Sequence, residues 1–128
     1  MNETNEQPPT ILVVDDSLFL RKRIRQVLKE DGYTLVEATS GKAALVEIEK
    51  QRFDCILTDL VMPDLDGFGL LAELQKRNLS TPVVVLTADI QKTTRERCEQ
   101  LGASTFIQKP LNPELLRSAL SKALGGRC

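Results

Sequence analysis

Residues 53–67 read FDCILTDLVMPDLDG. A short apolar run leads into a single carboxylate, Asp59, and a turn containing Pro63 and Gly67 follows at once. A buried carboxylate without a partner is very unfavourable, so we expect Asp59 at the end of a buried strand, at the rim of the core. The stretch therefore predicts a strand, a reactive position and a turn into a helix.

Strands and helices alternate along the rest of the chain. Short apolar runs predict strands, and apolar residues at helical spacing between them predict helices. Such alternation is typical of right-handed βαβ units, so we expect an α/β fold with a doubly wound parallel sheet of about five strands and about five helices. The expected strands cover residues 10–14, 33–38, 53–58, 83–86 and 104–108, and the expected helices cover residues 18–31, 41–51, 67–77, 90–101 and 113–124.

The composition excludes several classes of protein. The 128 residues carry a net charge of −1, which argues against a protein that binds nucleic acid or anionic membranes by charge. No apolar run reaches the roughly 18 residues that a spanning helix needs. The chain has no histidine, and its three cysteines show no paired spacing, so we expect no zinc site and reduced thiols in a cytoplasmic protein.

Polar side chains end four of the expected strands. Asp15 and Asp16 follow the first strand, Asp59 the third, Thr87 the fourth and Lys109 the fifth. Because the carboxyl ends of parallel strands meet at one edge, these groups should converge. Three close carboxylates repel one another unless a cation intervenes, and oxygen ligands suit Mg²⁺. The lysine and the hydroxyl suit a phosphoryl group, so Asp59 is the candidate to form an aspartyl phosphate.

These residues carry a resemblance to a known family. In order along the chain, the pattern resembles the receiver domain of two-component response regulators, and most closely the stand-alone chemotaxis-regulator type. The similarity extends from about Thr10 to Leu124, and it implies a flavodoxin-like sheet with strand order 2-1-3-4-5. The motifs that carry it are Asp15-Asp16, Asp59-x-x-Met62-Pro63-x-x-Asp66-Gly67, Thr87-Ala88 and Phe106-x-x-Lys109-Pro110.

The resemblance implies a chemistry for Asp59. The residue would accept a phosphoryl group from a histidine kinase or a histidine phosphotransfer protein. The cofactor would be Mg²⁺, held by Asp16, Asp59 and the Val61 carbonyl, with Asp15 reaching the ion largely through water. The protein would then be a phosphoacceptor rather than an enzyme acting on a separate substrate.

The resemblance also implies a conformational switch. Lys109 and the Ala88 backbone would contact the phosphoryl group, and the Lys109–Pro110 peptide would be cis. Thr87 would move toward the phosphoryl group, and Phe106 would turn inward with it.

Two positions near the reactive residue vary in the family and border the path of the hydrolytic water. Val61 stands two residues beyond Asp59, and Asp89 stands two residues beyond Thr87. An apolar Val61 should not position that water, whereas Asp89 offers a carboxylate. We therefore expect an intermediate lifetime for the phosphoryl group.

The expected helix from Ile90 to Leu101 is poor in apolar residues. A helix with a thin buried stripe gains little from packing, so we expect a low-stability element that phosphorylation shifts. By resemblance, this helix, Phe106 and the final helix would bind an unknown downstream protein, with neither nucleic acid nor membrane involved. We expect one receiver domain over residues 10–125, a flexible tail over residues 1–9, no effector domain, and a monomer before phosphorylation.

Other interpretations remain open. The chain could be a pseudo-receiver that acts without phosphorylation, a flavin-binding relative of the same fold, or a small phosphatase of the haloacid-dehalogenase type with Asp64 and Asp66 in its motif. Asp15 or Asp16 could simply cap the first helix. The basic run over residues 21–25 indicates a solvated helix face or a docking surface for a kinase. The cysteines are expected to be inert, with Cys128 open to oxidation.

Overall fold

The computed structural model describes residues 7–125. Cys128 and most of the expected tail over residues 1–9 lie outside these described residues. Within them, five parallel strands form one sheet in the order β2-β1-β3-β4-β5, which confirms the predicted fold. The elements are β1 (Thr10–Val14), α1 (Leu18–Val27), β2 (Thr34–Ala38), α2 (Gly41–Lys50), β3 (Cys55–Thr58), α3 (Gly67–Lys76), β4 (Val83–Thr87), α4 (Lys92–Gln100), β5 (Thr105–Gln108) and α5 (Pro113–Ala123).

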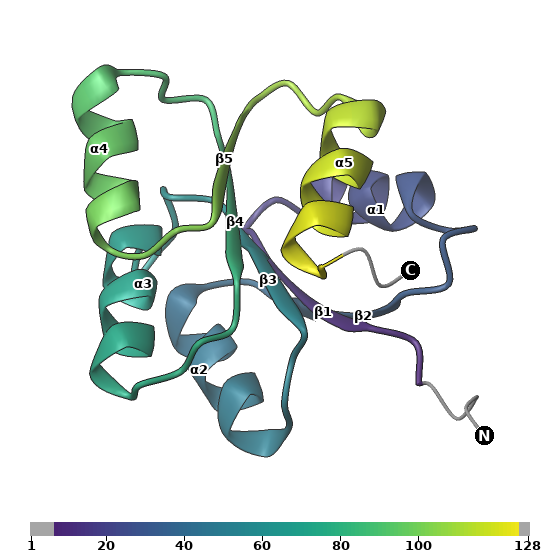
Figure 1. Ribbon diagram of the computed structural model, residues 1–128, viewed down its shortest axis with the longest axis horizontal. Coiled ribbons are helices and arrows are strands. Elements are labelled where there is room, and N and C mark those ends of the chain that lie inside the picture. The colour runs from purple at the N-terminus through teal and green to yellow at the C-terminus, as the bar shows by residue number, and fades with distance from the viewer. Residues whose placement is uncertain (1–6, 126–128) are drawn as a thin grey trace.

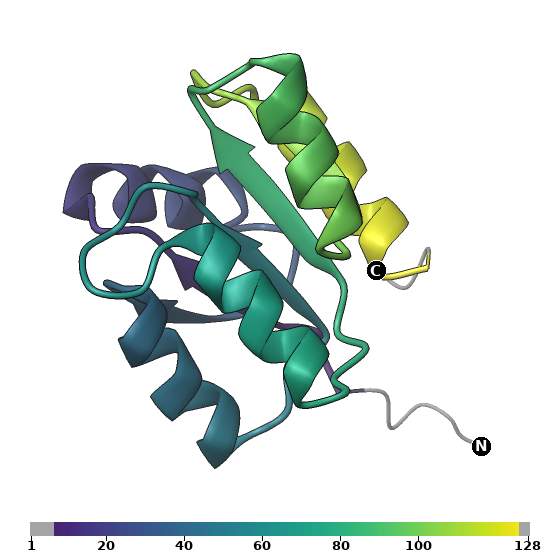
Figure 2. The same cartoon turned by 90° about the vertical axis from the view of Figure 1, so that its left-hand side faces the viewer.

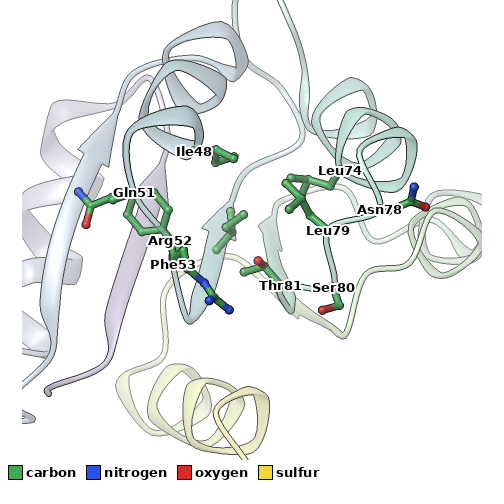
Figure 3. A pocket seen from close by; sticks show the side chains of 10 residues that line it. Ile48, Gln51, Arg52, Phe53, Leu74, Asn78, Leu79, Ser80 and Thr81 are labelled. Carbon is green, nitrogen blue, oxygen red and sulfur yellow. The ribbon is translucent and has the colours of Figure 1, made fainter. Parts of the chain in front are cut away.

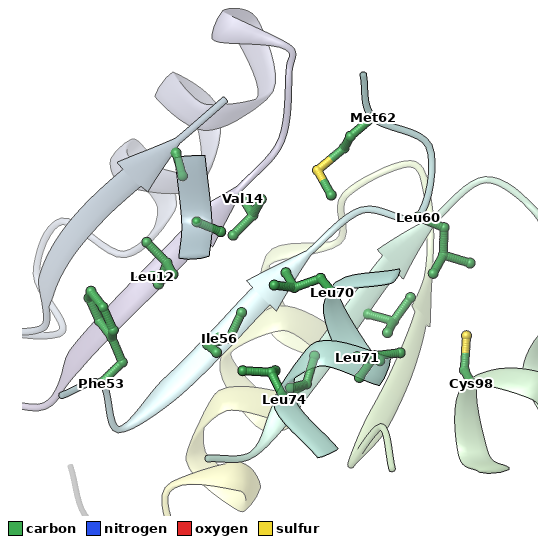
Figure 4. Close-up of a cluster of buried hydrophobic side chains, with 14 residues drawn as sticks. Leu12, Val14, Phe53, Ile56, Leu60, Met62, Leu70, Leu71, Leu74 and Cys98 are labelled. Atoms are coloured by element: carbon green, nitrogen blue, oxygen red, sulfur yellow. The ribbon is translucent and has the colours of Figure 1, made fainter. Parts of the chain in front are cut away.

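Helices cover both faces of the sheet. Helices α1 and α5 lie on one face, and α2, α3 and α4 lie side by side on the other (Figures 1 and 2). Successive side chains of a strand point to opposite faces. Leu12 and Val14 of β1 therefore join the cluster beneath α2 and α3, and Ile11 and Val13 join the cluster beneath α1 and α5. Figure 4 shows the first cluster.

Polar residues begin four of the five helices. Ser17, Ser40, Asp66 and Asn112 are N-caps whose side chains accept a backbone hydrogen bond. The alternative that Asp15 or Asp16 caps the first helix is excluded, because Ser17 is the cap. The start of α5 agrees with the pattern of its sequence, since Pro113 stands in the first turn directly after the cap.

The first helix is shorter than the sequence predicts. It ends at Val27 instead of residue 31, and turns follow as far as Gly32. After Leu28 the Lys29 N–H donates to Gln26 O and the Asp31 N–H donates to Leu28 O, so the helical ladder tightens into three-residue steps. Gly32 has φ +80, a conformation that glycine adopts readily, and it leads the chain into β2.

Helix α4 is weakly anchored. It spans Lys92–Gln100, slightly less than the expected 90–101, and only Thr94 and Cys98 of the helix are buried. Its N-cap residue, Gln91, makes no side-chain capping bond. These features favour a low local stability, which remains a prediction for hydrogen exchange to test.

The two cysteines among the described residues, Cys55 and Cys98, are buried free thiols. Burial raises the pKa of Cys55 to about 12, so its thiol stays protonated and unreactive at neutral pH. Among the helices of residues 7–125, none has the length and apolar character needed to cross a membrane.

Candidate functional site

The site lies at the carboxyl ends of β1, β3 and β5. Val14 and Thr58 are paired in the register of β1 and β3, so the residues that follow them, Asp15 and Asp59, stand side by side. The backbone N–H of Asp59 donates to Val14 O at 3.1 Å and holds this arrangement. Lys109 follows β5, and its ammonium lies 2.9 Å from Asp59 Oδ2 and 3.4 Å from Asp15 Oδ2. The structure therefore brings together three of the predicted site residues.

Each buried carboxylate has one oxygen on the backbone and one directed at the lysine. Asp15 Oδ1 accepts from the Ser17 N–H at 2.8 Å, and Asp59 Oδ1 accepts from the Leu60 N–H at 2.6 Å. The Oδ2 atoms of both residues face the Lys109 ammonium. Backbone bonds thus orient both carboxylates, and their other oxygens converge on a single cation.

Burial and charge act in opposite directions at this site. Burial raises the pKa of the Asp15 carboxyl above its ordinary value, and the Ser17 N–H and the Lys109 ammonium only partly oppose it. Burial lowers the pKa of Lys109, but the hydrogen bond to Asp59 and the charge of Asp15 outweigh it, so that pKa is raised. Two carboxylates face one ammonium, and the site keeps an excess of negative charge that favours a further cation.

The residues present fit a hard divalent cation. The donors that converge are carboxylate oxygens, which are the ligands that Mg²⁺ prefers in proteins. The exposed Asp16 and the loop carrying Val61, whose side chain is 74% exposed, border the same edge. Within residues 7–125 no group of three or more acidic, histidine or cysteine side chains is gathered for a metal. Asp15 and Asp59 meet at Lys109, and Asp16 is exposed beside them.

Thr87 is connected to the start of α4. Its side chain is buried, and its hydroxyl accepts from the Asp89 N–H at 3.2 Å. The Asp89 carboxylate accepts from the Gln91 N–H at 3.0 Å and from the Thr94 hydroxyl at 2.8 Å. These two bonds lower the pKa of the exposed Asp89 carboxyl. Asp89 thus links Thr87 to one of the two buried residues of α4.

Phe106 lies half-buried at the edge of the core, against the cluster of buried side chains that Figure 4 shows. The Arg95 guanidinium of α4 stands 5.1 Å from the centre of its ring. A cation over an aromatic face is attracted to it, so Arg95 of α4 stabilises this position of the ring. The Lys109–Pro110 peptide bond is cis, the geometry that the resemblance implies.

Gly67 shapes the turn that follows Asp59. Its N–H donates to Leu60 O at 2.9 Å, and a Cβ at this position would clash with the carbonyl oxygen of Asp59 and lie 2.7 Å from Leu60 Cα. The start of α3 can approach the Asp59 backbone this closely only without a side chain.

One residue beside the site is not predicted by sequence reasoning. The sequence indicates a solvated face or a docking surface over residues 21–25, and this is wrong for Arg21, which is buried. Its guanidinium donates to the backbone oxygen of Asp15 at 2.8 Å and to Glu37 at 2.8 Å. The available signal is its helical spacing of three residues from the buried Ile24, but a charged residue at such a position is rarely assigned to the core.

A separate hollow of about 190 Å³ lies at the opposite end of the sheet, between α2 and α3 (Figure 3). Apolar Phe53 and Leu74 and polar Gln51 and Ser80 are among its lining residues. It borders the amino ends of β3 and β4, whereas Asp59 and Thr87 are at their carboxyl ends. No residue of the candidate site lines it.

Known proteins match nearly the whole chain. The family model for the response regulator receiver domain matches residues 11–121. The sensor protein EvgS of Escherichia coli (strain K12) is 37% identical over 123 residues, which cover 91% of this chain and 10% of EvgS. The transcriptional regulatory protein ResD of Bacillus subtilis (strain 168) is 34% identical over 113 residues, which cover 88% of this chain and 46% of ResD. The chain thus spans less than half the length of these relatives.

Solved structures agree with this match. Vibrio cholerae chemotaxis protein CheY4 is 31% identical, with a TM-score of 0.85 and coverage of 91% of this chain and 99% of CheY4. The receiver domain of a signal transduction histidine kinase from Syntrophus aciditrophicus is also 31% identical, with a TM-score of 0.84 and coverage of 92% of this chain and 91% of that one.

Proposed function

The chain belongs to the family of response regulator receiver domains, and we propose that it is a switch of a two-component system, phosphorylated on Asp59. Receiver domains are phosphoacceptor switches, not classical enzymes, and typically bind Mg²⁺ at the phosphorylation site. The observation that carries the proposal is the convergence of Asp15, Asp59 and Lys109, because a phosphoryl transfer site needs an oriented nucleophile beside groups that neutralise charge.

The proposed nucleophile is Asp59, the member of the carboxylate pair that follows the central strand β3 and lies nearer to Lys109, at 2.9 Å against 3.4 Å for Asp15. Its Oδ1 is held by the Leu60 N–H, so Oδ2 is the oxygen that attacks phosphorus. The new O–P bond forms as the bond from phosphorus to the donor breaks, and the donor's electron pair leaves with its nitrogen or oxygen. The Lys109 ammonium, which donates to Asp59 Oδ2 before the transfer, then donates to a phosphoryl oxygen and neutralises part of its negative charge.

The proposed cofactor is Mg²⁺, which would neutralise charge on the phosphoryl oxygens when it is bound. Asp16, Asp59 and the Val61 carbonyl would hold it, with Asp15 acting largely through water. The convergence of carboxylate oxygens supports this assignment, and Asp16 is exposed directly after Asp15 at the same edge of the sheet.

The proposed response travels through Thr87 and Phe106. Thr87, together with the Ala88 backbone, would contact the phosphoryl group. If the Thr87 hydroxyl moves to that group, the Asp89 N–H loses its acceptor. The start of α4 then loosens, and Phe106 is released to turn inward.

The proposed donor is a histidine kinase or a histidine phosphotransfer protein, in the cytoplasm. The proposed output is the binding of a downstream protein to the surface formed by α4, Phe106 and α5, and it involves neither nucleic acid nor membrane. We propose that the domain is a monomer before phosphorylation. The phosphatase alternative gains no support from Asp66, whose carboxylate accepts from the Gly69 N–H and caps α3.

Phosphorylation with a small donor tests the proposal. The protein is incubated with Mg²⁺ and acetyl phosphate, and intact-mass spectrometry follows the addition of one phosphoryl group. The wild type should be modified, Asp59→Asn should not, and Asp66→Asn should behave as the wild type because asparagine also caps helices. Equal modification of Asp59→Asn would overturn the assignment.

Beryllofluoride with Mg²⁺ distinguishes the alternatives. A receiver should change its amide NMR spectrum around Thr87 and α4, whereas a pseudo-receiver should not respond. A phosphatase should turn over phosphate esters, and a flavin binder should purify with a yellow colour.

A further inference from the structure

We infer that Arg21 is a positioning residue for the metal-binding loop, which fixes the peptide between Asp15 and Asp16 and so directs the Asp16 carboxylate. The inference rests on the proposed function of the same site. It is carried by the buried bond from Arg21 Nη1 to the backbone oxygen of Asp15, at 2.8 Å.

The Asp15 backbone is held on both sides. Its N–H donates to Ala38 O of β2 at 3.1 Å, and its carbonyl accepts from Arg21. The carbonyl oxygen belongs to the peptide plane that continues into Asp16, so holding the oxygen fixes the rotation of that plane. Asp16 is exposed, and this constraint limits the directions that its carboxylate can take.

The guanidinium is itself held in place. Arg21 Nε donates to Glu37 Oε1 at 2.8 Å, and Glu37 Oε2 accepts from Arg25 Nε at 2.9 Å. Glu37 lies on the edge strand β2, one residue before Ala38. The planar Arg21 guanidinium is hydrogen-bonded at both ends, to Glu37 and to the Asp15 carbonyl, so its orientation is fixed. It therefore connects the end of β2, α1 and the loop that carries Asp15 and Asp16.

The orientation that Arg21 gives to this loop should affect the affinity for Mg²⁺. Groups that orient the ligands of a metal from behind are typically worth about 10–100-fold in metal affinity. The charge of Arg21 works in the opposite direction, because a cation near the site repels Mg²⁺. Loss of the charge alone predicts tighter Mg²⁺ binding, and loss of positioning predicts weaker binding, so the sign of the change separates the two effects.

The experiment titrates Mg²⁺ alone into the metal-free protein and follows amide NMR shifts. Arg21→Met should raise the Kd for Mg²⁺ about 10-fold. Arg23→Met is the matched control, since it removes the same charge from an exposed position of the same helix, and its Kd should be unchanged or lower. Arg21→Lys should recover part of the affinity, because an ammonium can still donate to the Asp15 carbonyl.

A second measurement needs no metal. In the metal-free protein, the Asp16 amide should shift and gain fast motion in Arg21→Met and not in Arg23→Met. A wild-type Kd and an unchanged Asp16 amide in Arg21→Met would overturn the inference, as would an equal loss of affinity in both variants. If Arg21→Met does not fold, Glu37→Leu replaces it, because it removes the acceptor that holds the guanidinium. A wild-type Kd and an unchanged Asp16 amide in that variant would equally overturn the positioning role.

The two proposals fail in different ways. If the wild type takes up neither Mg²⁺ nor a phosphoryl group, the proposed function fails. The shift and motion of the Asp16 amide in metal-free Arg21→Met then still test whether Arg21 positions this peptide. If the wild type binds Mg²⁺ and is phosphorylated while Arg21→Met binds Mg²⁺ equally well, only the positioning role fails.

Discussion

Lys109 Nζ donates to Asp59 Oδ2 over 2.9 Å, so the proposed phosphoacceptor is paired with the residue proposed to contact the phosphoryl group. The same ammonium lies 3.4 Å from Asp15 Oδ2. One cation therefore offsets the repulsion between two buried carboxylates, and a phosphoryl group or a metal entering the site must share or replace it.

Removal of Lys109 should make stability depend on Mg²⁺. In Lys109→Met, Asp15 and Asp59 face each other without a cation, and we expect the free energy of unfolding to fall by about 1–3 kcal/mol without metal. Saturating Mg²⁺ should restore part of this loss, because the ion replaces the ammonium. Urea unfolding with and without Mg²⁺ measures both quantities. Lys22→Met, at an exposed position of α1, is the control, and an identical loss in the two buffers would contradict the prediction.

The side chain at position 61 should set the lifetime of the phosphoryl group. Val61 is 74% exposed and offers no hydrogen bond to an attacking water. In Val61→Asn, a new hydrogen bond of about 0.5–1.5 kcal/mol in the transition state corresponds to a decay about 2–10-fold faster. Loss of the phosphorylated mass after removal of acetyl phosphate gives the rate. Val46→Asn, on an exposed position of α2, should decay as the wild type, and no change in Val61→Asn would count against this role.

The bond between Thr94 and Asp89 should hold the start of α4. Thr94→Val keeps the buried shape and removes the donor to Asp89 Oδ2, so amide exchange in the first turns of α4 should accelerate by about 2–10-fold, the equivalent of about 0.5–1.5 kcal/mol. The lowered pKa of Asp89 should also rise toward its ordinary value, because the carboxylate loses one of its two donors.

Hydrogen exchange and a carboxyl NMR titration check the two effects. Thr93→Val changes the exposed neighbour in the same helix and should alter neither quantity. Exchange in α4 as slow as in the central strands, with or without phosphorylation, would show that the helix is not the low-stability element proposed.

Gly67 and Gly69 should respond oppositely to alanine. A Cβ at Gly67 meets the Asp59 and Leu60 backbone, which cannot yield cheaply, and Gly67→Ala should destabilise the protein by about 1–3 kcal/mol and shift the Asp59 amide. A Cβ at Gly69 meets mainly the end of the Leu65 side chain, which can rotate away. Gly69→Ala should therefore be neutral or stabilise α3 by up to about 1 kcal/mol. Thermal unfolding of the two variants measures the change in stability. Equal changes in Gly67→Ala and Gly69→Ala would show that the turn at Gly67 tolerates a side chain.

The sequence by itself determined the order of the elements and the edge at which the chemistry lies. Apolar runs such as 53–58 identify buried strands from local pattern alone, and a polar residue directly after such a run must stand at the strand end. Parallel strands then bring Asp15, Asp59 and Lys109 to one edge whatever the details of packing.

The tertiary structure alone decided which partner each polar group takes. Lys109 joins Asp15 and Asp59 across three strand ends, Asp16 stays exposed, and Arg21 turns inward to the Asp15 carbonyl. Hydrophobic periodicity predicts where an apolar side chain goes because burial alone stabilises it. A charged side chain is buried only when partners meet it there, and the partner of the Arg21 guanidinium is Glu37 of β2, sixteen residues away. The spacing from Ile24 places Arg21 on the buried face of α1, but only the tertiary structure supplies the partner that allows its burial.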